Sequence, residues 1–322
     1  MSATDTGLRD FDDLVRRYRR ELHVHCYRML GSFDEAEDHV QEVLLRVWRS
    51  RDSFEGRSSP RTWLYRVATN ACLDTLRRDA RRAVPVASGS APSVATLPWV
   101  QPYPDTLLDE LVADQPGPEA VALTRETVSL AFLAAIQLLP PRQRAVLILR
   151  DVVAGSAAEV ADMLDMTVAA VNSALQRARA TLRERMPDWT PLAEPDEAQR
   201  RMLDRYIAAH EQADPELLIA ILRHDIRLAI SPDVGEWNGR ESVSEALRDG
   251  MNSLGRWRTL PIMANGQPGV AGYLRRPGET AFYPFTIGVL RFEPDGLVEM
   301  ASFEAPSLFP VFGLPESLPA LD

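Results

Sequence analysis

The chain of 322 residues contains no lysine, so all 36 of its basic residues are arginines. Any contact between a basic side chain and an anion must therefore come from a planar guanidinium, which suits two-pronged binding of phosphates and of guanine. A bias in genome composition would also remove lysine, and both explanations remain open. The absence of lysine limits the basic contacts to guanidinium groups, but it does not identify the anions that they bind.

Cysteine is also scarce, because the chain has only Cys26 and Cys72, both in apolar helical contexts. We expect buried free thiols rather than a disulfide framework. The run His23-Val24-His25-Cys26 has residue types that bind metals, but residues one and two apart on a helix do not share a face. No second pair of ligands follows, so the sequence predicts no metal site and no cofactor.

Long apolar runs are missing as well. No segment has the length and apolar character needed to cross a bilayer. The polar, acidic N-terminus lacks the basic stretch and apolar core of a signal peptide. We therefore expect a cytoplasmic protein without a membrane partner.

Acidic residues outnumber basic ones by 46 to 36, and the formal net charge is −10. The acidic surplus falls between Asp105 and Glu119 and in the C-terminal third, whereas arginines cluster in particular helical segments. Because the local field matters more than the total charge, an acidic chain can still bind nucleic acid through an arginine-rich surface. The length predicts two or three compact units.

Three amphipathic helices are predicted at the start of the chain. Apolar residues recur at three- and four-residue spacing between residues 11 and 29, before a stop at Gly31. A second helix is expected from Asp34 to Trp48 and a third from about Arg61 to Arg82. The polar loop between these two contains Gly56, Ser58, Ser59 and Pro60.

Between residues 83 and 118 the pattern changes to Pro, Ser, Ala and Gly with acidic residues, which predicts a flexible linker. The run Trp99-Val100-Gln101-Pro102-Tyr103-Pro104 inside it is unusually aromatic. A linker without a function would not need these rings. A docking segment and a plain spacer are the two interpretations.

A helical pattern returns between residues 119 and 188. Pro140-Pro141 indicates the start of a helix, and the segments on either side of Asp165 predict a helix-turn-helix. Asp165 tolerates the left-handed backbone of such a turn, and Thr167 is a good N-cap. A short linker follows at residues 189–196.

Residues 197–322 have helices first and strands after, which is the order of an α+β domain. Helices are expected at Glu197–Gln212 and Pro215–Leu222. Strands are expected at Ile226–Ile230, Arg258–Ala264, Val270–Leu274, Phe282–Leu290 and Val298–Phe303.

Two distant segments carry a family resemblance when they are taken together. The first has Asp34-Glu35-Ala36-Glu37-Asp38-His39-Val40-Gln41-Glu42 and, further on, Trp63-Leu64-Tyr65-Arg66-Val67-Ala68-Thr69-Asn70. The second begins Leu139-Pro140-Pro141-Arg142-Gln143-Arg144 and ends at Gln176-Arg177-Ala178-Arg179. In this order they resemble regions 2 and 4 of a sigma-70 family factor of RNA polymerase, of the small group-4 (extracytoplasmic-function) kind.

The resemblance implies a multi-domain fold: an all-α region 2 bundle at 1–82, a flexible linker at 83–118 and an all-α region 4 helix-turn-helix at 119–188. After the short linker at 189–196, residues 197–322 resemble a SnoaL-like (nuclear transport factor 2-like, NTF2-like) α+β cone. That likeness rests on element order, on the turn at Asn265-Gly266 and on the closing segment from Phe309 to Pro315. With the aromatic linker, it resembles the sigma-G-like and sigma-J-like branch.

An acidic stripe on the second helix is the first candidate site. By resemblance this helix binds the clamp helices of core RNA polymerase, and the contacts expected there are Glu35, Asp38, Gln41 and Glu42. The alternative is that these carboxylates only favour the helix dipole at its N-terminus.

The loop before the third helix, and that helix itself, match the part of the family that opens the −10 element. Melting requires a pocket for an unstacked base, with hydrogen-bonding groups and stacking surfaces. Trp63 is either a melting wedge or part of the core. The residues expected to contact −10 DNA are Ser58, Ser59, Trp63, Arg66, Asn70, Arg77 and Arg78.

The outward face of the helix after Thr167 is the candidate −35 reader, and a solvated helix surface is the alternative. The resemblance and the residue types place Asn172, Ser173 and Gln176 on bases. They place Arg177, Arg179 and Arg183 mainly on phosphates.

For the C-terminal domain we expect regulation rather than catalysis, with an unknown small ligand in its pocket. Its polar candidates show no spacing that demands acid–base chemistry. We therefore predict a non-enzymatic protein whose partners are core polymerase and double-stranded and melted promoter DNA. A polymerase-independent DNA-binding regulator and a small-molecule enzyme on the C-terminal domain are the alternatives. The polar candidates are His210, His224, Asp225, Tyr273, Tyr283 and Glu304.

Overall fold

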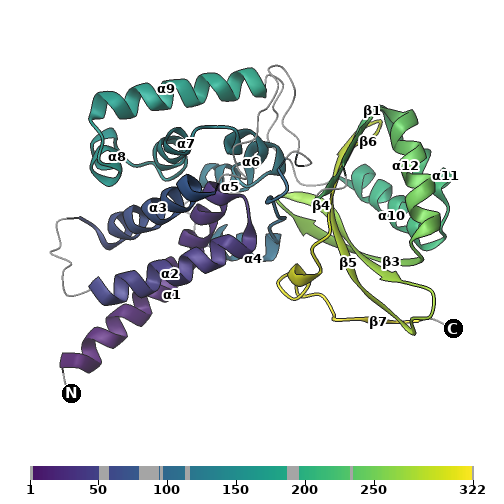
Figure 1. Ribbon diagram of the computed structural model, residues 1–322, viewed down its shortest axis with the longest axis horizontal. Helices are drawn as coiled ribbons and strands as arrows, with labels where there is room; N and C mark the ends of the chain where they lie inside the picture. Colours follow the sequence, from purple (N-terminus) through teal and green to yellow (C-terminus); the bar gives the residue numbers. More distant parts are fainter. Residues whose placement is uncertain are drawn as a thin grey trace. The chain divides into compact units, whose positions relative to one another are not determined.

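The computed structural model describes residues 3–50, 58–79, 94, 97–112, 117–186, 196–232 and 235–320. The chain forms two compact units (Figure 1). The first comprises Met1–Pro92 and Leu111–Thr190, and the second comprises Ser93–Glu110 and Pro191–Asp322. Part of the predicted linker therefore belongs to the C-terminal unit.

The first unit begins with a bundle of three mutually contacting helices, α1 (Ala3–Leu30), α2 (Phe33–Ser50) and α3 (Pro60–Arg78). Gly31, with a φ of 80°, ends α1, because this left-handed backbone carries no Cβ penalty in glycine. The apolar residues of the predicted stripes form the core of the bundle. Fully buried members include Leu22, Cys26, Met29, Val40, Val43, Leu64 and Cys72.

The third helix is shorter than expected. It ends at Arg78, and Asp79 takes up extended backbone, whereas the sequence pattern continued to Arg82. Arg81 and Arg82 lie outside the described residues. Arginine has a high helix propensity, so composition alone does not locate this helix end.

Histidine side chains link the three helices. The Nε2 of His25 lies 2.9 Å from the Thr69 hydroxyl on α3, and the Nε2 of His39 lies 2.9 Å from the Thr75 hydroxyl. Burial lowers the pKa of His25 to about 3, since the low-dielectric interior disfavours the charged ring. His23 packs against the Phe33 ring, 4.6 Å between centroids. The His-Cys run therefore serves interhelical packing.

The rest of the first unit carries the helix-turn-helix. After α5 (Pro118–Glu126) and α6 (Leu130–Gln137), α7 (Pro141–Leu147) continues into a π-helical turn at Ile148–Val152. The motif consists of α8 (Ala157–Leu164) and α9 (Val168–Arg185). As predicted, Asp165 is left-handed, with a φ of 56°, and the Thr167 side chain caps α9 by accepting from the Ala170 amide.

A buried arginine joins the two halves of this unit. Arg144 on α7 is only 3% exposed, and its guanidinium donates to the Met29 carbonyl at the end of α1 at 2.5 Å. It also donates to the side-chain oxygen and the carbonyl of Gln137, at 2.6 and 2.7 Å. The Gln137 amide in turn donates to the Arg28 carbonyl at 3.2 Å. The last carbonyls of α1 thus receive donors from α6 and α7.

The second unit is a curved, mixed sheet with helices on one face, which confirms the predicted α+β class. Its strand order is β2-β1-β6-β5-β4-β3, with β7 paired to β5, and all pairs are antiparallel except β1 with β6. The strands are β1 (Leu222–Ser231), β2 (Gly235–Asn238), β3 (Arg256–Ala264), β4 (Gln267–Arg275), β5 (Ala281–Glu293), β6 (Gly296–Phe303) and β7 (Leu318–Pro319). The sequence analysis did not predict β2 or β7.

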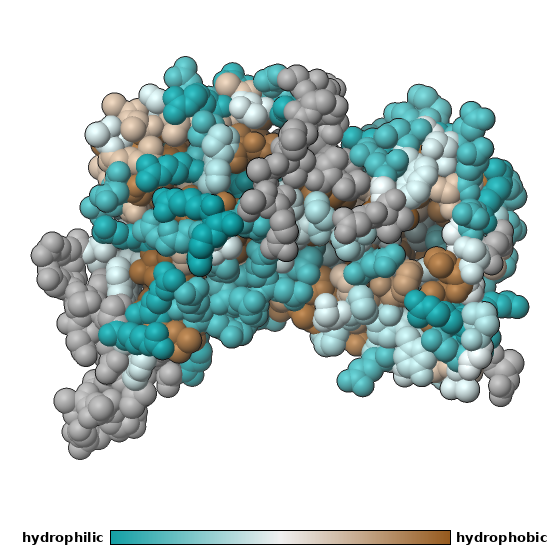
Figure 2. All heavy atoms as spheres, in the orientation of Figure 1, coloured by the Kyte–Doolittle hydropathy of each residue, from teal (hydrophilic) through white to brown (hydrophobic). Residues whose placement is uncertain are grey.

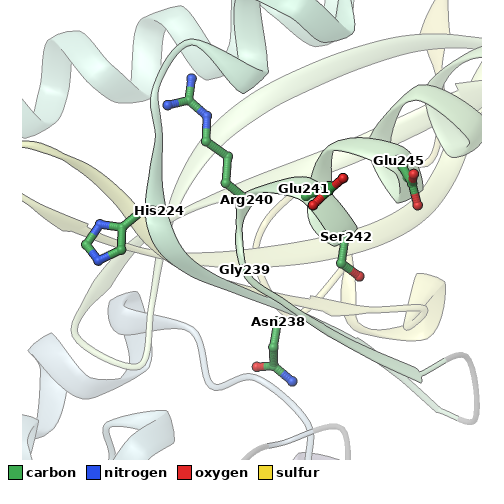
Figure 3. Close-up of a pocket in the computed structure, with 7 residues that line it drawn as sticks. All are labelled: His224, Asn238, Gly239, Arg240, Glu241, Ser242 and Glu245. Carbon is green, nitrogen blue, oxygen red and sulfur yellow. The ribbon is translucent and has the colours of Figure 1, made fainter.

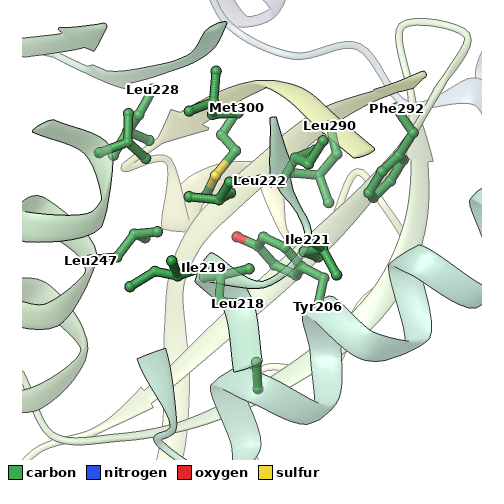
Figure 4. Close-up of a cluster of buried hydrophobic side chains, with 14 of the residues drawn as sticks. Tyr206, Leu218, Ile219, Ile221, Leu222, Leu228, Leu247, Leu290, Phe292 and Met300 are labelled. Carbon is green, nitrogen blue, oxygen red and sulfur yellow. The ribbon is translucent and has the colours of Figure 1, made fainter. Parts of the chain in front are cut away.

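Three helices lie on one side of this sheet: α10 (Glu197–Glu211), α11 (Pro215–Ile219) and α12 (Arg240–Ser253) (Figure 1). The sequence analysis missed α12. Residues from these helices and from alternate strand positions form a hydrophobic cluster, among them Tyr206, Leu218, Leu247, Leu290 and Met300 (Figure 4).

The opposite face of the sheet has its own hydrophobic cluster. Ala271 and Tyr273 alternate with residues of the first face along β4, as the two-residue period of a strand requires, and they pack with Phe309 of the tail. Tyr273 and Phe309 meet edge to face at 5.0 Å. The closing segment noted in the sequence therefore seals this face.

The aromatic linker segment docks on the second unit. The Tyr103 amide donates to the Asn265 side-chain oxygen at 2.8 Å, and the Asn265 amide donates to the Tyr103 carbonyl at 2.9 Å. The Asp105 carboxylate accepts from the Gly266 amide at 2.9 Å. The expected linker also contains α4 (Asp105–Val112). Of the two interpretations of this segment, the structure supports docking.

Among the helices that the structure describes, none combines the length and apolar character needed to span a bilayer. Hydrophilic residues cover most of the face visible in Figure 2, and hydrophobic residues show there only as separate patches.

Replacing the buried guanidinium tests its structural role. We expect Arg144→Met to lower the free energy of unfolding by about 2–4 kcal/mol, because the carbonyls of Met29 and Gln137 lose buried donors. The matched control is Arg142→Met, an exposed position on the same helix, which should change stability by less than about 0.5 kcal/mol. Urea unfolding followed by circular dichroism measures both, and equal values for the two variants would contradict the assignment.

Candidate functional site

The acidic stripe on α2 is largely solvent-exposed. Asp38, Gln41 and Glu42 are exposed, whereas Glu35 is half-buried. Glu42 pairs with Arg46 at 2.5 Å on the same helix. An ion pair this exposed contributes only about 0–1 kcal/mol, so these carboxylates can form other contacts at little cost.

An exposed leucine extends this stripe. Leu45 is 55% exposed and stands three and four residues after Glu42 and Gln41, which places it on the same helix face. The sequence analysis did not include it, because the stripe was defined by acidic and amide side chains. A single exposed leucine is common on protein surfaces, and here it lies beside the acidic residues of the stripe.

The predicted −10 residues divide into different structural roles. The Ser59 hydroxyl accepts from the Thr62 amide at 3.0 Å and caps α3, while Ser58 is exposed. Trp63 is half-buried, so it belongs fully neither to the core nor to the surface. Arg77 pairs with Asp74 at 2.9 Å. The part of the polar loop at residues 51–57 lies outside the described residues.

Arg66 and Asn70 of α3 contact the first helix of the helix-turn-helix. The Arg66 guanidinium lies 3.3 Å from the Asp162 carboxylate, and the Asn70 amide donates to the Met163 carbonyl at 3.4 Å. Both side chains are otherwise exposed. These contacts are long and solvent-screened, so they are weak, yet they occupy two side chains that were predicted to bind DNA.

The outward face of α9 is continuous and polar. Its inward face is closed by Val171, Ala174, Leu175 and Ala178, which are buried. Val168 at the helix start is 45% exposed, and sequence reasoning missed it; an exposed methyl group there suits contact with a thymine methyl. All six predicted residues are exposed: Asn172, Ser173, Gln176, Arg177, Arg179 and Arg183.

Arg179 differs from its neighbours on α9. Its guanidinium binds both oxygens of Asp151, at 2.8 and 2.6 Å, in a bidentate pair. The Asp151 hydrogen bonds and charge raise the pKa of Arg179. This arginine therefore connects α9 to the turn that follows α7.

The polar candidates of the second unit do not converge on one site. His224 is exposed and lines a polar hollow near the start of α12, where the labelled side chains point in different directions (Figure 3). Asp225 is paired with Arg223 at 2.9 Å. Tyr273 lies on the opposite face of the sheet and donates to the Pro315 carbonyl at 2.9 Å, and Tyr283 is 45% exposed.

Only His210 and Glu304 of those candidates line a common cavity, which lies between the sheet and helices α10 and α12. Its volume is about 580 Å³. The burial of His210 lowers its pKa to about 4, whereas Glu304 is exposed. The sequence analysis named only these two residues as polar candidates and did not predict the rest of the lining, because the cavity is assembled from eight separate helices and strands.

Two family models match the first unit. Residues 14–82 match Sigma-70 region 2, and residues 129–182 match Sigma-70, region 4.

One of two curated relatives extends the likeness over both units. The chain is 40% identical to the ECF RNA polymerase sigma factor SigG of Mycobacterium tuberculosis, over 96% of this chain and 85% of that protein. It is 31% identical to the ECF RNA polymerase sigma factor SigW of Bacillus subtilis, over 55% of this chain and 89% of that protein.

A solved structure has the same fold. The crystal structure of the Mycobacterium tuberculosis extracytoplasmic function sigma factor SigJ matches with a TM-score of 0.59 and 21% identity. The match covers 96% of this chain and 99% of that one, and therefore includes the C-terminal α+β unit.

Proposed function

The chain belongs to the extracytoplasmic-function sigma factors of RNA polymerase, which direct core polymerase to promoters. From this premise we propose that α2 binds core polymerase, that α3 opens the −10 element and that α9 reads the −35 element. The observation that carries the proposal is the chemical contrast between two exposed helix faces, one acidic with a leucine and the other polar with arginines. The action of the chain is then binding and strand separation, without covalent chemistry.

The core-binding surface consists of Asp38, Gln41, Glu42 and Leu45. Charged residues at the edge of an interface steer association, whereas a buried apolar residue supplies affinity. The carboxylates are held on a rigid helix, because Val40 and Val43 anchor its other face in the bundle core. The half-buried Glu35 contributes at the margin of this surface.

Charge reversal tests the core-binding surface. We expect Asp38→Arg with Glu42→Arg to weaken binding to purified core polymerase by roughly tenfold or more, and Leu45→Ala by a similar factor. The control, Asp204→Arg, changes an exposed acidic residue of the second unit and should leave affinity unaltered. Fluorescence anisotropy gives the affinities, and run-off transcription should fall in parallel. Unchanged affinity in both α2 variants would refute this surface.

On α9 the expected division is between base and phosphate contacts. Asn172, Ser173 and Gln176 present amide and hydroxyl groups that pair with base edges. Arg177 and Arg183 present guanidinium groups to the backbone, and each phosphate contact releases counterions and steepens the salt dependence of binding. Arg179 acts mainly through its brace to Asp151.

Three substitutions separate these roles. Gln176→Ala should cost about 1–3 kcal/mol on the preferred −35 sequence and relax specificity at one position. Arg177→Gln should weaken binding on all sequences and reduce the salt slope by about 1. Arg179→Gln should leave the salt slope nearly intact and instead lower thermal stability. Holoenzyme binding to −35 variants across a salt series measures these effects, and identical salt slopes for Arg177→Gln and the wild type would exclude its phosphate contact.

The contacts of α3 with α8 bear on how the promoter is bound. Arg66 and Asn70 must leave Asp162 and the Met163 carbonyl before they can contact DNA. Since the contacts are weak, polymerase and DNA can displace them at a small energetic cost. We therefore regard this arrangement as a resting conformation of the first unit.

The second unit regulates promoter choice through the linker, and it has a cavity for a small ligand. The linker joins the −10 and −35 readers, and residues 93–110 of it belong to the second unit. Docking shortens the free length of chain between the readers, and a shorter tether narrows the range of separations that both can reach. The bound linker therefore sets the preferred spacing between promoter elements.

Removing the Asn265 side chain tests the tether. Asn265 has a φ of 56°, so Asn265→Gly keeps the backbone geometry but deprives the Tyr103 amide of its acceptor. We expect about tenfold faster amide hydrogen exchange at residues 97–105 and transcription that tolerates a wider range of promoter spacers. The control, Ala213→Gly, changes another left-handed residue of this unit and should alter neither property. An unchanged spacer preference despite faster exchange would end the tether proposal.

A further inference from the structure

The cavity of the second unit has the dimensions of a small-molecule site. Its volume of about 580 Å³ lies within the range of roughly 300–1,000 Å³ that is typical of such sites. Most of the lining is hydrophobic and comes from the sheet and from α12. These residues include Leu228, Ile230, Leu247, Met251, Leu290 and Met300.

Two buried hydrogen-bonding groups in the lining lack a partner among the described residues. They are the indole nitrogen of Trp257 and the hydroxyl of Thr259, which are neighbours on the same face of β3. Thr259 is only 4% exposed. An unpaired buried polar group costs about 1–3 kcal/mol, so folded proteins rarely retain two side by side without a use.

A third polar group in the lining is an acceptor. The Nδ1 of His210 lies 3.0 Å from the Tyr206 carbonyl, and a carbonyl only accepts, so Nδ1 carries the hydrogen. With its pKa lowered to about 4 by burial, the ring is neutral near pH 7 and its Nε2 presents a lone pair. The rings of His210 and Trp257 lie edge to face with centroids 6.3 Å apart, so the ring that carries the donor and the ring that carries the acceptor are neighbours.

The charges of the lining indicate which ligands are excluded. The described lining residues include the exposed acids Glu245, Asp249 and Glu304 but no arginine. An anion would meet repulsion at the rim and no counter-charge inside. A cation would have to leave water for an apolar interior, at a cost of several kcal/mol.

A helical glycine leaves part of the cavity open. Gly250 lies within α12 and lines the cavity, and a Cβ built at this position would meet no atom within 4 Å. A glycine inside a helix costs roughly 1 kcal/mol relative to alanine. The helix therefore gives up stability at a position where a side chain would point into open space.

We propose that this cavity binds an uncharged, largely apolar small molecule that carries a hydroxyl group. The hydroxyl oxygen accepts a hydrogen bond from Trp257 or Thr259, and its hydrogen is donated to His210 Nε2. Ligand occupancy ties α10 and α12 to the sheet that also holds the docked linker. The regulatory part of this inference rests on the proposed function, whereas the binding part stands alone.

Three molecules that share one ring system test which substituent the cavity accepts. They are 1-naphthol, naphthalene and 1-naphthoate, each titrated into the full-length protein by calorimetry. We expect 1-naphthol to bind roughly tenfold more tightly than naphthalene, because one hydrogen-bonding group is worth about 1.4 kcal/mol. We expect 1-naphthoate not to bind. Equal affinity for naphthol and naphthoate, or no binding of naphthol, would overturn the proposal.

Variants locate the site. Gly250→Leu should abolish naphthol binding by filling the cavity. The isosteric Thr259→Val and the smaller Trp257→Phe each remove one donor and should each weaken binding several-fold. The control is Glu241→Leu, an exposed position of α12 outside the lining, which should bind like the wild type. If Gly250→Leu proves unstable, the affinities of Thr259→Val and Trp257→Phe test the site instead. Full affinity for 1-naphthol in both variants would show that it binds outside this cavity and would overturn the proposed site.

Transcription separates the two parts of the inference. Saturating 1-naphthol should shift the spacer preference of the wild-type holoenzyme and leave Gly250→Leu unaffected. Binding without any shift in the wild type would refute the regulatory part while the site itself stands. Absence of binding would refute the site, whereas the tether proposal would still be judged by Asn265→Gly.

Discussion

The first unit is organised around one buried charge, the guanidinium of Arg144. Arg144 lies almost fully buried between α1, α6 and α7, and its guanidinium donates to carbonyls at the end of α1 and to Gln137. The C-terminal end of a helix carries partial negative charge and unpaired carbonyls, so a buried cation is stabilised there. The guanidinium holds its donors in a fixed planar arrangement. The Arg144 hydrogen bonds therefore fix the orientation of α7 on α1 as well as holding the two helices together.

The two exposed helix faces depend on this arrangement. α2 packs on α1, and α9 packs on α7, so the Arg144 contact fixes the scaffold that carries both faces. One face is acidic and the other carries arginines. This separation of charge explains how a chain with a net charge of −10 can bind DNA. The acidic groups gather on α2 and in the second unit, and the exposed arginines of α9 present a local positive surface.

The second unit uses the two faces of one sheet differently. One face is sealed by the tail through Phe309, and the other is covered by helices but left partly hollow. The edge turn at Asn265 holds the linker. A single sheet therefore connects a closed core, a cavity and a docking point, and a change at the cavity has a short route to the linker through β3, which ends at that turn.

The sequence by itself determined the kinds and approximate limits of most elements, but not α4, α12, β2 or β7. Some features follow from interactions between residues close together in the chain, and the sequence alone therefore predicts them. They are the apolar periodicity of α1 and α2, the left-handed backbone of Asp165 and the cap formed by Thr167. The exposed face of α9 was also predictable, because the apolar periodicity of the sequence identifies its buried stripe and the remaining positions face solvent. The stop of α3 at Arg78 was not predictable, because the arginines around it have a high helix propensity and give no signal of a helix end.

Tertiary structure alone decided the rest, because the deciding contacts join residues far apart in the chain. The bond from Tyr103 to Asn265 makes part of the predicted linker a part of the second unit, and Arg179, for which the sequence predicts a phosphate contact, pairs with Asp151 in the structure. The cavity is another case: Trp257 and Thr259 of β3 carry no motif, and their hydrogen-bonding groups, unpaired among the described residues, acquire a role only once the fold places them beside His210 of α10. Local propensity sets which segments form, whereas burial and hydrogen-bond pairing across the fold set what each side chain does.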